Sequence, residues 1–160
     1  MQPKTFDRLI VFSLFFMGYW FFGNLYEEIV MIPNQLFFTY ETVKSYLNYF
    51  HFSNPVFYFV PFTQMAVVVL IFLYVKCDDG RKKQLLKKAS VYGSLAIILT
   101  IVIVTQINMK LFAPDFHLYR DQLYTLSVWW LLGNALRIFL VGKSLYFTFR
   151  TFVARQARTT

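Results

Sequence analysis

Four long apolar stretches, separated by short polar segments, dominate the hydrophobic pattern of the chain. They cover residues 9–32, 56–75, 89–109 and 123–149. Each has about the 20 residues that an α-helix needs to cross a ~30 Å hydrocarbon layer. The alternation of apolar and polar residues that marks a membrane β-strand is absent from the sequence. The pattern therefore predicts an all-α, polytopic membrane protein with a single domain, residues 1–160, folded as a four-transmembrane-helix bundle.

A fifth segment, between the first two apolar stretches, has an amphipathic pattern. Its apolar residues recur at the spacing of one helix face, and polar residues fall between them. These apolar positions are Leu36, Tyr40, Val43, Leu47 and Phe50. We expect a helix that lies on the outer membrane surface or folds over the bundle as a cap, and either position is compatible with a plain anchor that binds no ligand.

The composition supports a membrane protein and excludes several other classes. Hydrophobic residues make up 58% of the chain, aromatic residues 21% and charged residues only 15%, which is more apolar material than a small soluble core can bury. A single Cys, with no paired His or Cys spacing, argues against a disulfide framework and a structural zinc site. The net charge of +8 comes from residues at the ends of apolar stretches, so nucleic acid is not an expected partner.

The distribution of Lys and Arg predicts the orientation in the membrane. The two termini and the segment between the second and third apolar stretches carry twelve of these residues, against three in the other two loops. Because positive residues are retained on the cytoplasmic side, we expect a protein of the inner (cytoplasmic) membrane with both termini in the cytoplasm. The basic segment 81–88 is predicted to be a cytoplasmic loop that determines the topology, and a role in binding lipid head groups stays open for it. The first stretch is too long for a signal peptide and is expected to remain as an anchor.

Polar side chains occur at regular positions within two of the apolar stretches. A charged side chain near the centre of a membrane helix costs about 2.5 to 3.5 kcal/mol, so each needs an explanation. The positions follow the i, i+4, i+7, i+11 spacing of one helix face, and we expect both faces to point inward. They are Trp20, Asn24, Glu27 and Met31 in the first stretch, and Trp130, Asn134, Arg137 and Val141 in the fourth.

These residues predict an outward-opening cleft between the helices that binds a small apolar or amphipathic molecule. Glu27 or Glu28 would take a proton at its mouth, and Asn134 and Arg137 would stabilise negative charge deeper in. The expected ligand-binding residues are Trp20, Asn24, Gln64, Gln106, Trp130, His51 and His117, the two histidines being in outer loops. Alternatively, the amides are interhelical hydrogen-bond glue and Arg137 extends to the inner head groups.

Two further arrangements of these groups are not expected. Helix geometry places Glu27 and Arg137 about 12 Å apart along the membrane normal, so no direct ion pair is predicted without a water or ligand between them. A metal site from His51, His117, Asp115 and either glutamate is disfavoured, because three separate segments supply the groups and no adjacent pair preorganises them. We therefore predict no metal ligands.

One motif resembles a known family. Trp130, Asn134 and Arg137 form a W-x3-N-x2-R pattern, and Pro33 directly follows the first apolar stretch. Together they resemble the anthrone-oxygenase-like family of small four-helix membrane proteins. The resemblance implies oxidation of polyketide-type aromatics without an obvious cofactor, although many members have no assigned function. His is common in that family where this chain has Asn134, so a proton-transfer role does not carry over to that position.

The leading prediction is an integral membrane protein with oxidoreductase or oxygenase-like chemistry on a bound small molecule. Whether the protein is an enzyme stays open at this point, and so does its cofactor. The alternative is a non-catalytic subunit or assembly factor, whose aromatic faces pack against a larger membrane partner or a second copy of the chain. A monomeric secondary transporter is disfavoured, because the sequence has no inverted repeat and no pair of interrupted helices.

Overall fold

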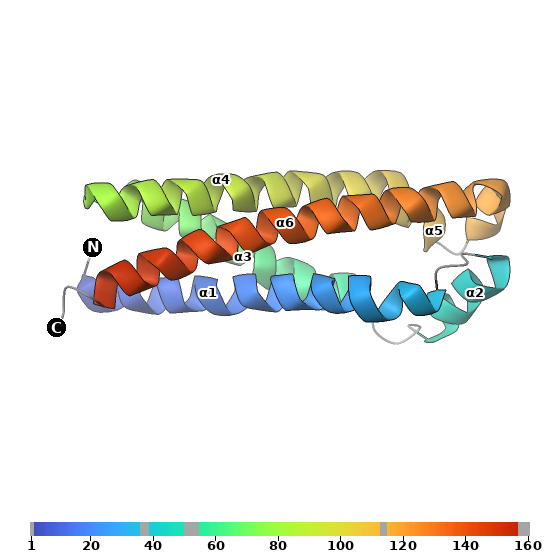
Figure 1. Ribbon diagram of the computed structural model, residues 1–160, viewed down its shortest axis with the longest axis horizontal. Coiled ribbons are helices and arrows are strands. Elements are labelled where there is room, and N and C mark those ends of the chain that lie inside the picture. The colour runs from blue at the N-terminus through green and yellow to red at the C-terminus, as the bar shows by residue number, and fades with distance from the viewer. Residues whose placement is uncertain (1, 36–38, 50–54, 113–114, 157–160) are drawn as a thin grey trace.

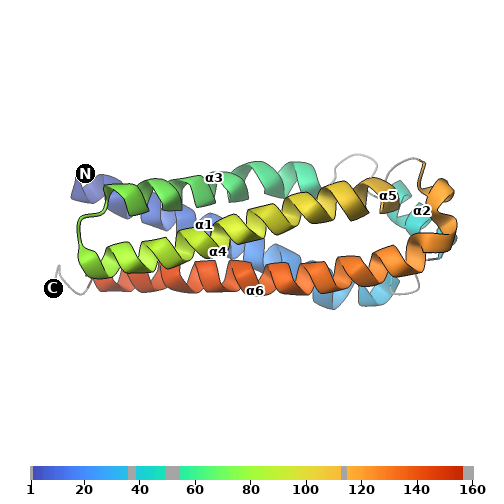
Figure 2. The same ribbon diagram turned by 90° about the horizontal axis from the view of Figure 1, so that it is seen from above.

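The computed structural model describes residues 2–35, 39–49, 55–112 and 115–156. Every regular element in these segments is a helix, so the predicted all-α fold class is confirmed for them. Four helices are long: α1 (Pro3–Tyr26), α3 (Pro55–Lys76), α4 (Gly80–Ile103) and α6 (Leu123–Gln156). They run side by side along the long axis of the molecule (Figures 1 and 2). The molecule is therefore an elongated assembly of packed helices.

The two ends of this assembly differ. Both chain termini lie at one end, which we call the terminal end (Figure 1). The short helices α2 (Tyr40–Tyr49) and α5 (Met109–Leu111) lie at the other, the cap end, together with the 3₁₀ helix η4 (Phe116–Gln122). A shorter 3₁₀ helix, η2 (Pro33–Gln35), follows α1. The cap end corresponds to the side that the charge distribution predicts to face outward.

Three helical stretches are long and apolar enough to cross a membrane. They are Lys4–Met31, Gly80–Leu111 and Phe116–Ala154, and each contains an apolar segment of 18 residues. A shorter apolar stretch, Val60–Lys76, belongs to α3. Large apolar side chains cover the outside of the helices; Phe15, for example, is 66% exposed. Length and apolar surface together indicate association with a membrane.

All four long helices extend beyond their predicted apolar stretches, α1 from Pro3 onward and α3 by only one residue at each end. The basic segment 81–88 is not a loop, as predicted, but forms the first turns of α4. Asp79 caps this helix, since its carboxylate accepts a hydrogen bond from the Lys82 amide at 3.2 Å. Hydropathy marks only the apolar part of a helix, whereas Lys, Arg, Gln and Leu are strong helix formers wherever they occur. For the same reason α6 continues past residue 149 to Gln156.

Two long helices widen into π-helical turns as they approach the cap end. α1 continues into η1 (Glu27–Met31), and α4 continues into η3 (Val104–Asn108) before α5. In the first, the Ile32 amide donates to the Glu27 carbonyl, five residues earlier, at 2.9 Å. Both turns contact α6. Such turns are rare and occur frequently at functional sites, and nothing in the hydrophobic pattern predicts them.

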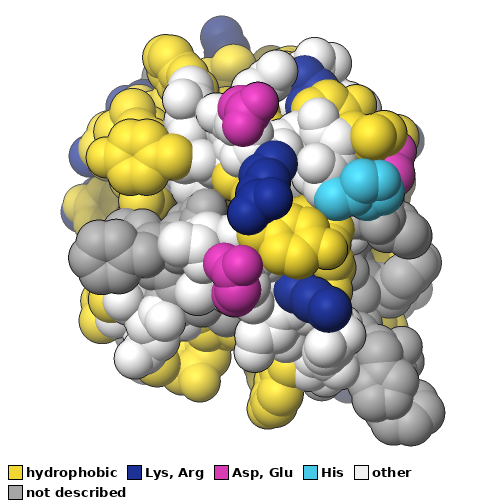
Figure 3. All heavy atoms as spheres, turned by 90° about the vertical axis from the view of Figure 1, so that its right-hand side faces the viewer, with side chains coloured by type: hydrophobic (Ala, Val, Ile, Leu, Met, Phe, Trp, Pro, Cys, Tyr) yellow, Lys and Arg dark blue, Asp and Glu magenta, His cyan; other side chains and the backbone are white. Residues whose placement is uncertain are grey.

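Helix α2 folds over the cap end of the long helices. Val43 is only 1% exposed, and the Tyr40 ring stacks on Phe116 with the centroids 5.0 Å apart. The amphipathic helix is therefore confirmed over its described positions, and it acts as a cap rather than lying apart on a surface. Leu36 and Phe50, the outer members of the predicted face, lie outside the described residues. Figure 3 views this end and shows acidic, basic and histidine side chains on it.

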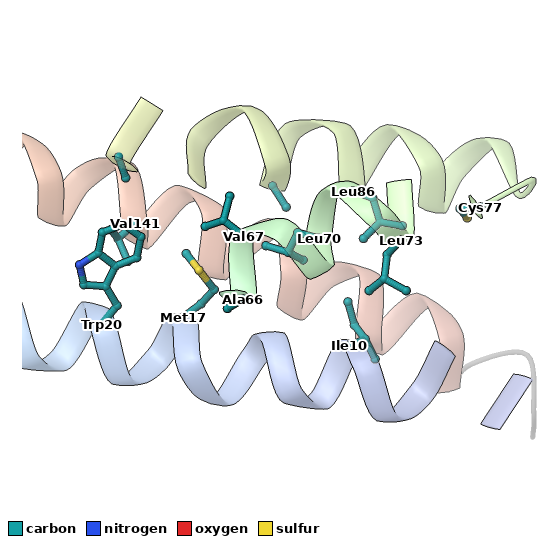
Figure 4. Packing of buried hydrophobic residues seen from close by; sticks show 12 residues of the cluster. Ile10, Met17, Trp20, Ala66, Val67, Leu70, Leu73, Cys77, Leu86 and Val141 are labelled. Atoms are coloured by element: carbon teal, nitrogen blue, oxygen red, sulfur yellow. The ribbon is translucent and has the colours of Figure 1, made fainter. Parts of the chain in front are cut away.

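The buried apolar residues form two separate clusters. The terminal core lies along the half of the helices nearer the termini, and Figure 4 shows its members between the helices. It consists of Ile10, Met17, Trp20, Ala66, Val67, Leu70, Leu73, Cys77, Leu86, Ala89, Ala96 and Val141. The cap core lies beneath α2 and consists of Ile32, Val43, Ile103, Leu111, Phe116, Leu123, Leu126 and Trp130. On α1 and α6 a group of polar residues separates the two cores.

Candidate functional site

The polar residues between the two cores form what we call the polar layer. It consists of Asn24 near the end of α1, Glu27 and Glu28 at the start of η1, and Asn134 and Arg137 in the middle of α6. α1 and α6 pack against each other in opposite directions, so the two polar faces predicted from the sequence meet. Asn24, Asn134 and Arg137 are 6%, 0% and 7% exposed. The layer is therefore inside the protein rather than on its lipid-facing surface.

Asn134 is the centre of the layer. Its side-chain nitrogen donates to a Glu28 carboxylate oxygen at 2.6 Å and to the Asn24 backbone carbonyl at 3.3 Å. Its side-chain oxygen accepts two hydrogen bonds from the Arg137 guanidinium, at 3.1 Å from Nε and 2.5 Å from Nη2. Both ends of the amide are therefore used, and Asn134 links the carboxylates of α1 to the cation of α6.

Arg137 also approaches Glu27 directly, with 3.8 Å between guanidinium nitrogen and carboxylate oxygen. The expectation that these two groups would not pair directly is therefore wrong. Helical side chains lean toward the N-terminus of their own helix. Because α1 and α6 are antiparallel, Glu27 leans toward the terminal end and Arg137 toward the cap end, which closes the axial gap from both sides. The guanidinium is thus directed into the protein and toward the cap end.

Two buried N–H groups at the layer have no hydrogen-bond partner in the described part of the chain. They are the side-chain amide nitrogen of Asn24 and the indole nitrogen of Trp130. Trp130 lies one helical turn from Asn134 on the side of the cap and is 6% exposed. Leaving a buried donor unpaired costs about 1 to 3 kcal/mol. Each donor would recover part of this cost by a hydrogen bond to an acceptor atom.

The carboxylates are the more open side of the layer, and α2 lies close to them. The Glu27 side chain is 19% exposed, against 9% for Arg137. Burial and the nearby Glu27 carboxylate both raise the pKa of Tyr46, a residue of α2. Tyr46 packs on Phe112 with the ring centroids 4.9 Å apart. It was not among the candidate residues, although its position three residues after Val43 places it on the buried side of α2.

The remaining predicted site residues are dispersed. Trp20 is a member of the terminal core and is 4% exposed (Figure 4). Gln64 is half-buried on α3, and none of the hydrogen bonds described for the polar layer involves it. Gln106 is exposed and lies 3.4 Å from the Thr105 hydroxyl, and His117 is exposed in η4. The structure therefore does not bring Gln106 to the layer. His51 lies outside the described residues.

The chemistry of the polar layer is that of charge and hydrogen bonding. In the part of the chain that the structure describes, no group of three or more His, Cys, Asp or Glu side chains could hold a metal ion. The layer combines two carboxylates that can accept a proton with a guanidinium and unpaired N–H groups that can stabilise an oxyanion. It is suited to a small molecule with an acidic proton or an acceptor oxygen.

Comparison with known proteins adds no identification. No protein-family model, no curated protein and no solved structure matches this chain. The resemblance of the Trp130, Asn134 and Arg137 pattern to the anthrone-oxygenase-like family stays a prediction.

Proposed function

We propose that the protein spans the cytoplasmic membrane with α1, α3, α4 and α6, as a four-helix bundle with both termini in the cytoplasm. In this arrangement the basic terminal end faces the cytoplasm and the cap end faces outward, as the excess of Lys and Arg at the terminal end supports. We further propose that the polar layer, in the outer half of the bundle, binds a small amphipathic molecule.

The observation that carries this proposal is the charged network of Arg137 with Asn134, Glu27 and Glu28 between two apolar cores. A network that served only as glue would satisfy its own members, because in a lipid environment unpaired polar groups have no water to bond to. At this network, by contrast, the buried N–H groups of the Asn24 and Trp130 side chains have no hydrogen-bond partner in the described residues. Intramembrane charges facing the interior of a bundle are typical of functional sites.

The residues also specify the kind of ligand. A carbonyl or phenolic oxygen would accept from the free N–H groups and from Arg137, and the apolar body would lie against the cap core near Trp130. Glu27 is the more exposed partner in its ion pair with Arg137. Its carboxylate would accept a proton from the ligand, and Arg137 would stabilise the resulting anion. Oxidoreductase chemistry on that anion is the reaction class that the family resemblance implies.

A second candidate function is that of a non-catalytic subunit of a larger membrane complex. Large aromatic side chains on the outside of the helices favour it; Phe22 is 64% exposed and Trp129 is 61% exposed. Lipid would cover these side chains equally well, so they favour a partner less strongly than the polar layer favours a ligand. Co-purification of a protein in a fixed ratio would identify this second function.

The test of the ligand site compares four forms of the full chain purified in mild detergent. These are the wild type, Arg137→Gln, Arg137→Lys and the control Gln106→Ala, which removes an exposed polar side chain outside the layer. Mass spectrometry of the extracted protein identifies any bound small molecule. We expect one in the wild type and the control, none in Arg137→Gln and little in Arg137→Lys, because Lys lacks the planar fork that grips an oxyanion. Equal amounts in all four forms would rule out the polar layer as the site.

Orientation is tested separately by cysteine labelling in intact cells. Cys77 is only 6% exposed, so its failure to react would say nothing about sidedness, and it should first be replaced by Ser. On that background we expect Ser45→Cys, at an exposed position of α2, to react with a membrane-impermeant reagent added outside. Lys87→Cys, at an exposed position of α4, should react only after the cells are opened. The opposite pattern would reverse the proposed topology.

A further inference from the structure

A cavity of about 240 Å³ lies at the terminal end, where α4 begins and the last turns of α6 pass it. It is far from the polar layer, which lies in the other half of the long helices. Both helices contribute to its wall, so it is an interhelical cavity rather than the tip of one helix. The residues that line it are Asp79, Arg81, Lys82, Leu85, Arg150, Val153 and Ala154.

The polar part of the wall is basic and preorganised. Lys82 is only 7% exposed, and its ammonium group lies 3.2 Å from the Asp79 carboxylate, so these two charges neutralise each other. Arg81 on α4 and Arg150 on α6 are exposed and have no carboxylate among the residues that line the cavity other than Asp79. Arg150 is oriented by a 2.8 Å hydrogen bond to the Tyr146 hydroxyl. Two guanidinium groups from different helices thus share one cavity.

The rest of the wall is apolar. Leu85, Val153 and Ala154 lie beside the charged groups, and Val153 is 45% exposed. In a membrane-spanning bundle this end of the helices lies at the level of the cytoplasmic head groups. A cavity with a cationic rim and an apolar wall at that depth matches the two parts of a phospholipid, whose phosphate binds the arginines while its first acyl carbons contact the apolar side chains.

We propose that this cavity binds the phosphate group of an anionic phospholipid from the cytoplasmic leaflet. Arginine suits this role because its planar fork donates two parallel hydrogen bonds to phosphate oxygens. Basic residues also occur outside the cavity: Lys88 lies over the Phe147 ring and Lys143 over the Phe139 ring, each 5.4 Å from the centroid, much as Arg150 lies 5.7 Å from the centroid of the Tyr146 ring. The proposal depends on the membrane-spanning arrangement proposed above but not on the polar layer, so either site can fail without the other.

The test measures lipid binding to the purified, delipidated full chain in neutral detergent by native mass spectrometry. The probes are phosphatidylglycerol, phosphatidylcholine with the same acyl chains, and glycerol phosphate. The site variant is Arg81→Gln with Arg150→Gln, and the matched control is Lys88→Gln with Lys143→Gln, which removes the same charge from the same two helices. We expect phosphatidylglycerol to bind the site variant at least about tenfold more weakly than the wild type, and the control to change less than about threefold.

Each other outcome overturns a defined part of the proposal. Equal weakening in both variants would mean that diffuse surface charge attracts the lipid and that the cavity does not. Phosphatidylcholine that binds as tightly as phosphatidylglycerol would exclude selection of an anionic lipid. Glycerol phosphate that binds equally tightly would make this a site for a free phosphate ester. If circular dichroism shows that the double site variant is unfolded, Arg150→Gln alone replaces it, with Lys143→Gln as its control.

Discussion

Polar side chains in the terminal half of the helices and in the polar layer satisfy their hydrogen bonds differently. In the terminal half, hydroxyl groups bond to backbone carbonyls: Ser144 donates to Ala89 at 2.8 Å, and Thr148 donates to Ser144 at 2.8 Å. These bonds involve no charge. Ser90, whose buried hydroxyl has no partner in the described part of the chain, is the exception in this half. Most of these hydroxyls therefore act as interhelical or intrahelical glue.

The polar layer differs, because most of its hydrogen bonds join one side chain to another and the layer contains both signs of charge. Asn134 uses its whole amide, yet Asn24 and Trp130 keep buried donors unpaired. Polarity within an apolar helix therefore does not by itself mark a site. A hydroxyl that bonds to a carbonyl is satisfied by the fold, whereas the buried donors of Asn24 and Trp130 at the charged network are not.

The largest effect is expected when the network loses its cation. Arg137→Leu leaves the Glu27 carboxylate without its ion-pair partner and removes both hydrogen bonds to the Asn134 oxygen. The free energy of unfolding should fall by about 3 to 5 kcal/mol, as it does when one partner of a buried pair is removed. Glu27→Leu combined with Arg137→Leu should recover part of the loss. The measurement is unfolding in detergent by added sodium dodecyl sulfate, followed by circular dichroism.

The prediction has a clear contrary result. Arg137→Leu would contradict it by lowering the free energy of unfolding no more than removal of one hydroxyl in the terminal half does. In that case the polar layer would have only the structural role of the other interhelical hydrogen bonds. Arg137→Gln, used above to test binding, should be milder, because Gln can still donate to the Asn134 oxygen.

The second effect concerns the cap that covers the layer. Val43→Asp places a charge where the side chain is 1% exposed, so α2 should undock at a cost of about 2 to 3 kcal/mol. Ser45→Asp, at an exposed position two residues later, is the matched control and should be nearly silent. Hydrogen exchange of the α2 amides measures the docking. If the α2 amides were equally protected from exchange in both variants, the docking of α2 would not depend on its buried face.

Much of the fold follows from the sequence, because the apolar stretches and the face of Val43 carry direct periodic signals. What the sequence does not reveal has physical reasons. The apolar stretch begins only at Ala89, although α4 begins at Gly80. Helix propensity and the Asp79 cap also form helix in polar segments, which hydropathy does not mark. The π-helical turns η1 and η3 leave no mark on a pattern of period 3.6, because they shift the register only locally.

The site is less predictable than the fold. The faces that carry Asn24 and Asn134 could be read from their spacing, and they do meet. Axial positions alone do not predict the pairing of Glu27 and Arg137, because the direction in which helical side chains lean also decides which groups meet. Gln106 was assigned inward from its residue type, yet it lies on an exposed face of η3. A lone polar residue carries no information on which face is buried.

A smaller effect is expected for glue in the terminal half. Ser144→Ala removes the 2.8 Å hydrogen bond from α6 to the Ala89 carbonyl of α4. The free energy of unfolding should fall by about 0.6 to 1.7 kcal/mol, the range for interhelical hydrogen bonds in membranes. The amount of small molecule that co-purifies should not change, and mass spectrometry checks this. If this variant lost the molecule, the terminal half would also contribute to ligand binding. The distinction between the two regions would then be wrong.

The smallest effect is expected from adding one methyl group at a glycine. A Cβ on Gly93 would lie 3.0 Å from a Val67 methyl and 3.3 Å from the Ser144 hydroxyl, whereas a Cβ on Gly18 meets nothing within 4 Å. Replacing Gly by Ala favours a helix by up to about 1 kcal/mol, and at Gly93 crowding between α3, α4 and α6 should offset this gain. Gly18→Ala should therefore stabilise the protein slightly, and Gly93→Ala should lower the free energy of unfolding by about 1 kcal/mol or less. Thermal unfolding of both variants in detergent decides the point. If both variants change the unfolding temperature equally, the terminal half is not closely packed. Close contact between helices would then not explain why its hydroxyls are hydrogen-bonded.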